Sequence, residues 1–280
     1  MHLVPGQVRT LHWMRAACAA TGLLAVLAGC VTTGGPLPKP RPTGDKDLAT
    51  ASDQTDADRL AKTRMELATA YFGRGQPTDA LDQVKLALQA RPDNPDAYSL
   101  RGLIYAALGD AKTADDSFKR ALQLAPRRSE IMHNYGWFLC QQGSYPEADA
   151  QFMAALAERA NRAPARTLLA QGVCQARAGN PVDAERTLSH AYELDPSNPT
   201  IALNLSEVLY KSGQYERALF YIRRVNTKDQ LATAQTLWLA ARIEHKLGQD
   251  EQVQQVGAQL HKRFPLARET LLFEKGTFDE

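Results

Sequence analysis

Histidine, cysteine and acidic side chains are the groups in this chain that could perform catalysis or hold a metal. The histidines beyond the first fifty residues, His133, His190, His245 and His261, lie in four separate segments. The sequence contains no Gly-rich phosphate loop, no Gly-x-Ser-x-Gly turn and no His-Glu-x-x-His helix. Because a catalytic centre needs such groups brought together, we expect no enzymatic activity, no small-molecule substrate and no cofactor other than a covalent lipid.

The chain has four cysteines, Cys18, Cys30, Cys140 and Cys174, whose thiols could in principle bind zinc. None of them forms a Cys-x-x-Cys pair or lies beside a His-rich tract, as zinc ligands do. We therefore predict no metal site.

Cys30 is a candidate site of lipidation. It follows an apolar stretch at residues 16–28, which is too short to span a bilayer as a helix and is preceded by Arg9 and Arg15. This pattern is typical of a secretory signal peptide and assigns it to residues 1–29, whether translation begins at Met1 or at Met14. The stretch ends in Leu-Ala-Gly-Cys, which resembles a lipobox, so Cys30 is expected to carry the lipid anchor.

The residue after Cys30 bears on the membrane to which the anchor attaches. Residue 31 is Val rather than Asp, and in the lipoproteins that the chain resembles this favours the outer membrane, on its periplasmic face. Residues 30–59 are rich in Gly, Pro, Thr, Ser and Asp and cannot bury a core of their own. We expect them to form a flexible tether of about 25 to 30 Å.

The elements that must position the later residues repeat along the chain. Gly75, Gly109, Gly143, Gly179, Gly213 and Gly248 recur at intervals of about 35 residues, and a small residue precedes each of the first four by seven positions. This pattern resembles the tetratricopeptide repeat, whose small residues let two helices approach closely. We therefore predict an all-α, right-handed α-solenoid of six helix-turn-helix repeats in residues 60–265. The expected repeats are 61–94, 95–128, 129–164, 165–198, 199–233 and 234–267, with a C-terminal cap or tail at 268–280.

The repeat pattern places Cys140 and Cys174 late on the first helices of neighbouring repeats. Adjacent helices lie about 8 to 10 Å apart, and facing Cβ atoms can then come within reach of a disulfide. A secreted chain meets an oxidising compartment, so we expect a bridge, with two separate buried thiols as the alternative.

The first helix of each repeat is expected to line the concave face of the solenoid. The apolar side chains predicted to face this groove, and to contact a partner, are Met65, Phe72, Leu103, Trp137, Leu169, Val173, Tyr210 and Trp238. The alternative for each is packing against a neighbouring first helix. Trp137 and Trp238 carry most of this hypothesis, because large aromatic side chains dominate peptide docking.

The charge balance argues against nucleic acid as a partner. The chain has 33 basic and 31 acidic residues, and residues 1–29 contain two of the basic ones and none of the acidic ones. The remainder is therefore neutral and lacks the basic stripe that phosphate binding requires.

The third repeat carries a more specific signature. The run His-Asn-Tyr-Gly-Trp-Phe-Leu-Cys at 133–140 is similar to the NYGWFLC signature of the PilF/PilW family of type IV pilus lipoproteins. The resemblance extends to Met-Glu-Leu-Ala at 65–68, Leu-Asn-Leu-Ser at 203–206 and Trp-Leu-Ala at 238–240.

That resemblance implies a pilotin, a lipoprotein that binds secretin subunits and promotes their localisation to the outer membrane and their assembly into the ring. The alternative within this family is a structural link that stabilises the finished ring. The alternative from another class is an adaptor in outer-membrane protein assembly or in peptidoglycan machinery.

Overall fold

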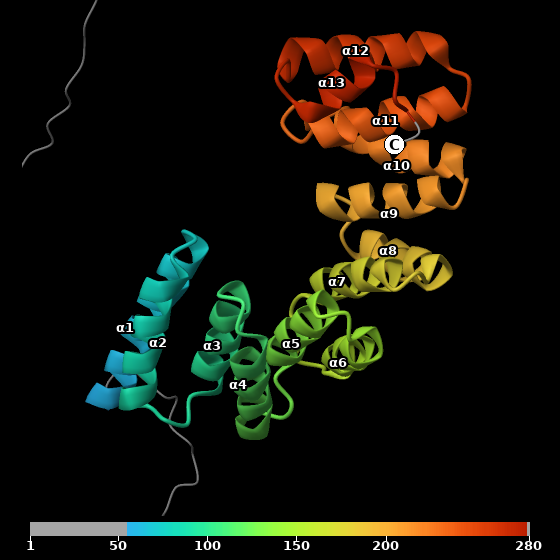
Figure 1. Cartoon of the computed structure of the whole chain (residues 1–280). Helices are drawn as coiled ribbons and strands as arrows, with labels where there is room; N and C mark the ends of the chain where they lie inside the picture. The colour runs from blue at the N-terminus through green and yellow to red at the C-terminus, as the bar shows by residue number, and fades with distance from the viewer. Residues whose placement is uncertain (1–54, 279–280) are drawn as a thin grey trace, which may run out of the picture. The chain divides into compact units, whose positions relative to one another are not determined.

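The computed structural model describes residues 55–278, and this part of the chain is all-α, as predicted (Figure 1). The predicted signal peptide, Cys30 and most of the predicted tether lie outside the described residues. The helices are α1 Asp56–Gly73, α2 Pro77–Ala90, α3 Pro95–Ala107, α4 Ala111–Leu124, α5 Ser129–Gln141, α6 Tyr145–Ala157, α7 Pro164–Arg177, α8 Pro181–Leu194, α9 Pro199–Lys211, α10 Tyr215–Asn226, α11 Ala234–Lys246, α12 Asp250–Arg263 and α13 Arg268–Glu274.

The helices from α1 to α12 form six consecutive pairs, and we call the odd-numbered helix of each pair A and the even-numbered helix B. Each A helix packs on its own B helix and also touches the A helix of the next pair. Within residues 55–278 the backbones of the B helices lie farther apart, and α8 and α10 meet through side chains, with the Tyr192 and Tyr221 ring centroids 4.9 Å apart and Arg217 paired with Glu185. The A helices therefore lie on the inner side of the stack, and the surface that they share is called the A-helix face.

The repeating glycines end the A helices. All six have φ between 67° and 82°, the left-handed region that glycine adopts without strain. In the second repeat the N–H of Gly109 donates to the Ala106 carbonyl, and that of Asp110 donates to the Tyr105 carbonyl. These are the paired hydrogen bonds of a helix-terminating turn, and α4 starts at once.

Small residues let helices A and B of one repeat approach each other. A Cβ atom added to Gly102 would lie 2.8 Å from the Phe118 ring, and one added to Gly172 would lie 2.6 Å from Leu188 Cγ. In the fifth repeat the corresponding residue is Ser206, which is fully buried and donates from Oγ to the Ala218 carbonyl at 2.9 Å. The serine thus fits the same position because its hydroxyl is satisfied.

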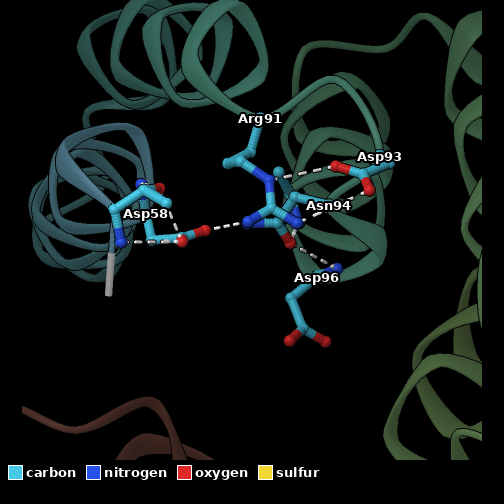
Figure 2. A network of polar contacts seen from close by, with 7 residues as sticks. Asp58, Arg91, Asp93, Asn94 and Asp96 are labelled. Carbon is cyan, nitrogen blue, oxygen red and sulfur yellow. Dashed lines mark hydrogen bonds and ion pairs between the residues drawn. The ribbon is translucent and has the colours of Figure 1, made fainter. Parts of the chain in front are cut away.

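The solenoid begins earlier than expected, because residues 55–59 belong to the first repeat and not to the tether. Thr55 and Asp58 form a capping box, in which the Asp58 N–H donates to Thr55 Oγ1 at 3.1 Å and the Thr55 N–H donates to Asp58 Oδ2 at 3.2 Å. Asp58 also pairs with Arg91, which reaches on to Asp93 (Figure 2). These bonds fix the start of α1 to the turn after α2.

The last pair is closed by α13, which packs on both α11 and α12. Gly257 in α12 makes room for this contact, because a Cβ atom there would overlap the Phe273 ring. The residues predicted as a cap therefore do cover the end of the stack. Among the described helices, none combines the length and apolar character needed to cross a membrane.

Candidate interaction surface

The run at 133–140 lies on α5, at the centre of the A-helix face, and ties three repeats together. Asn134 Nδ2 donates to Ser99 Oγ in the second repeat at 3.2 Å. Tyr135 stacks on Phe118 and donates from its hydroxyl to Asp115 Oδ1 at 2.7 Å. Burial and this hydrogen bond raise the pKa of Tyr135, so its hydroxyl stays protonated. Much of the signature is therefore structural.

The same helix is joined to the fourth repeat by a disulfide bond between Cys140 and Cys174, whose Cα atoms are 5.8 Å apart. Both cysteines are buried and pack with Ala148 and Phe152. The bond fixes α5 beside α7, and with it the spacing of the A-helix face at this point.

Trp137 lies next to this bond and remains partly exposed. Its ring packs against the cluster that contains the two cysteines, and the guanidinium carbon of Arg177 on α7 lies 5.2 Å from the ring centroid. Such a cation-π contact helps to hold both side chains. Trp137 is therefore a fixed part of the A-helix face.

A hollow of about 280 Å³ opens beside Arg177, among α7, α8 and α9, and Val173, one of the residues expected to face the groove, contributes to its lining. Val208 and Leu188 contribute further apolar surface, and Asn204, Glu207 and Lys211 contribute polar groups. We call it the Val173 hollow. An apolar centre with a polar rim is the usual composition of a protein docking site.

A second hollow, of about 390 Å³, lies between α1 and the start of α3. Met65 and Ala61 supply its apolar lining, while Lys62, Arg91 and Asp96 are among its charged residues. Met65 thus lines a hollow on an A helix, but more charged side chains surround this hollow than surround the Val173 hollow.

Three of the predicted groove residues mainly pack inside the solenoid. Phe72 and Leu103 are partly buried against the core of the first two repeats. Leu169 packs between the cores of the fourth and fifth repeats. For these three residues the structure therefore supports the alternative prediction, which was packing between neighbouring repeats.

The prediction that Trp238 lines an open groove is wrong, because Phe278 covers it. Trp238 is only 7% exposed, and its ring centroid lies 5.3 Å from that of Phe278. Tyr210 is partly buried under Arg242, whose guanidinium carbon lies 4.8 Å from the ring centroid. The C-terminal segment thus occupies the end of the A-helix face.

The A helices α5 and α11 carry His133 and His245, and the buried His133 ring meets the Phe152 ring of α6 edge-on. Burial, and to a smaller extent the charge of Arg166, lower the pKa of His133 to about 4, so it is neutral near pH 7. His245 stacks on Phe278. No cluster of three or more possible metal-ligating residues occurs within residues 55–278.

Several residues of this surface did not emerge from the sequence, above all Arg177, Asn204, Glu207, Arg242 and Phe278. Arg177, Glu207 and Arg242 follow from helix geometry, because positions three or four residues from Val173, Tyr210 and Trp238 share their side of an A helix. Asn204 lies one further step along the same side of α9, three residues before Glu207. Phe278 lies outside the repeat pattern, and no spacing signal indicated it.

Comparisons with known proteins agree with this architecture. A family model described as a tetratricopeptide repeat matches residues 105–172 and 175–243, and a second with the same description matches 65–129. Tetratricopeptide repeats form a protein-interaction fold.

The full-length similarities are more specific. The type IV pilus assembly protein PilF of Pseudomonas aeruginosa is 25% identical over 253 residues, which are 90% of this chain and 95% of that protein. The crystal structure of PilW, a widely conserved type IV pilus biogenesis factor, superposes with a TM-score of 0.70 and 29% identity, covering 76% of this chain and 97% of that one. The structure of Pseudomonas aeruginosa PilF has a TM-score of 0.68 at 23% identity and covers 79% and 100%. Repeat content, fold and similarity along nearly the whole length agree, and the chain belongs to the PilF/PilW family of tetratricopeptide-repeat proteins.

Proposed function

We propose that this chain is a non-catalytic docking lipoprotein of type IV pilus biogenesis. In this proposal the A-helix face binds secretin subunits, and the lipid on Cys30 brings them to the periplasmic face of the outer membrane, where they assemble into the multimer.

The observation that carries the proposal is the similarity to PilF and PilW through the whole solenoid, and not only through a few repeats. Generic tetratricopeptide repeats share their packing residues. The run at 133–140 adds side chains beyond that shared packing, because it fixes the second, third and fourth repeats to one another. A rigid centre with one accessible face suits a scaffold that holds another polypeptide.

The Val173 hollow is the best docking position on that face. Val208 is 6% exposed and supplies a buried apolar floor, while Asn204, Glu207 and Lys211 can hydrogen-bond to a main chain. Binding energy in such sites concentrates where an apolar side chain fills a pocket and surrounding polar groups exclude water. We place the main contact with secretin here.

The predicted anchor and tether complete the proposal. Each methylene of a lipid chain that enters the membrane contributes about 0.8 kcal/mol, so the several acyl chains of a lipidated cysteine give lasting attachment. A flexible tether lets the solenoid reach a subunit before it inserts.

The test is direct binding of purified secretin subunit to two full-length variants. Val173→Arg places a charged side chain in the hollow, whereas Val182→Arg places it on α8, where the native side chain is 79% exposed. We expect Val173→Arg to lower the affinity at least about tenfold, or about 1.4 kcal/mol, and Val182→Arg to leave it unchanged. Equal affinities of both variants and the wild type would contradict docking at the hollow.

A further inference from the structure

Side chains of the last A helix, α11, hold a residue of the same chain, Phe278. Trp238, Arg242 and His245 are spaced by four and three residues and therefore share one side of the helix. The Phe278 ring lies against this side, 5.3 Å from the Trp238 ring and 4.4 Å from the His245 ring between centroids. Both pairs are nearly parallel, with interplanar angles of 27° and 20°.

The main chain of Phe278 is held as well. Arg242 Nε donates to the Phe278 carbonyl oxygen at 2.9 Å. The same guanidinium lies over the Tyr210 ring on α9, which fixes its direction. The fifth and sixth repeats therefore cooperate in binding one aromatic residue of the segment that follows α13, and we call Tyr210, Trp238, Arg242 and His245 the aromatic site.

The segment reaches this site through a turn. Gly276 has φ of 66° and ends α13, and the Thr277 N–H donates back to the Leu272 carbonyl at 3.1 Å. Phe273 is seated on Gly257 and meets the Phe278 ring edge-on at 5.7 Å. Gly257 thus supports the position of Phe278 from the other side of the segment.

The contacts use only an aromatic ring and a main-chain carbonyl, which an extended segment of another polypeptide can also present. We infer that the aromatic site is a second docking position, for an extended partner segment that carries an aromatic side chain, and that Phe278 occupies it until such a segment displaces it. This inference rests on the proposed function, in which the A-helix face binds polypeptides.

Occupation by Phe278 weakens the binding of the partner in a measurable way. A tethered segment competes at an effective concentration of about the millimolar range. If Phe278 fills the site nine-tenths of the time, the apparent affinity for a partner falls about tenfold. Removing the Phe278 side chain should raise the apparent affinity for the partner by the same factor.

The experiment titrates full-length protein with the peptide acetyl-Lys-Gly-Thr-Phe-amide, which has the sequence of residues 275–278. The signal is the indole N–H resonance of Trp238, identified by its loss in Trp238→Phe. Phe278→Ala should bind the peptide at least about tenfold more tightly than the wild type. Gly257→Ala should also gain affinity, because its methyl group displaces Phe273, which touches Phe278.

Two controls make the test specific. Phe220→Ala removes a phenylalanine that is 53% exposed on α10, away from the aromatic site, and should behave as the wild type. A peptide with Ala in place of Phe should not shift the resonance. Equal affinities of Phe278→Ala and the wild type, or equal binding of the Ala peptide, would overturn the inference. The readout involves no secretin, so its failure is distinguishable from loss of secretin binding at the Val173 hollow.

Discussion

Cys140 on α5 and Cys174 on α7 are joined by a disulfide that links the third repeat to the fourth, and the two cysteines are 34 positions apart in the sequence. One cysteine ends the run that contacts the second repeat, and the other lies one residue after Val173 of the proposed docking hollow. The bond therefore connects the rigid centre of the solenoid to its accessible face.

Replacing both cysteines by alanine should lower the free energy of unfolding by about 3 to 4 kcal/mol, because the unfolded chain gains the entropy of an open loop. Denaturant unfolding with and without reductant measures this difference. Reductant should destabilise the wild type and leave the double variant unchanged. A double variant as stable as the oxidised wild type would contradict a stabilising bridge.

The close approach of helices A and B gives a second prediction. Gly102→Ala should destabilise the fold by about 1 to 3 kcal/mol, since its Cβ would press on the buried Phe118 ring. Gly73→Ala is the matched control, because nothing lies within 4 Å of a Cβ at that helical position. That variant should be neutral or gain about 0.4 to 1 kcal/mol, and thermal unfolding compares the two. Equal effects would show that steric packing is not the reason for glycine at 102.

His133 predicts a pH dependence of stability. Burial lowers its folded-state pKa to about 4 from 6.5, so the unfolded chain takes up the proton more readily. The associated stability is complete above pH 6.5 and is lost as the pH falls toward 4, by about 3 kcal/mol.

Urea unfolding at pH 7, 5.5 and 4 tests this expectation. His133→Phe removes the titrating group and should lose less stability on acidification than the wild type. His190→Phe alters an exposed histidine on α8 and should follow the wild type. If all three proteins lose the same stability, His133 does not titrate as described.

The sequence was most informative where the fold is periodic. Turn glycines and small residues recur because each repeat solves the same packing problem, so the helix pairs and the position of Val173 could be predicted. The start at Asp56 was missed because Thr55 and Asp58 look like linker residues until their capping bonds are seen. The covering of Trp238 was missed because Phe278 is 40 residues away and belongs to no repeat.

The measurement that tests the central claim most directly is the amount of heat-resistant secretin multimer in membrane fractions. The amount of multimer should be compared among cells that lack the protein and cells that contain the wild type, Cys30→Ala, Val173→Arg or Val182→Arg. We predict loss of multimer without the protein and with Val173→Arg, partial loss with Cys30→Ala, and normal multimer with Val182→Arg. Normal multimer in cells without the protein would contradict the account.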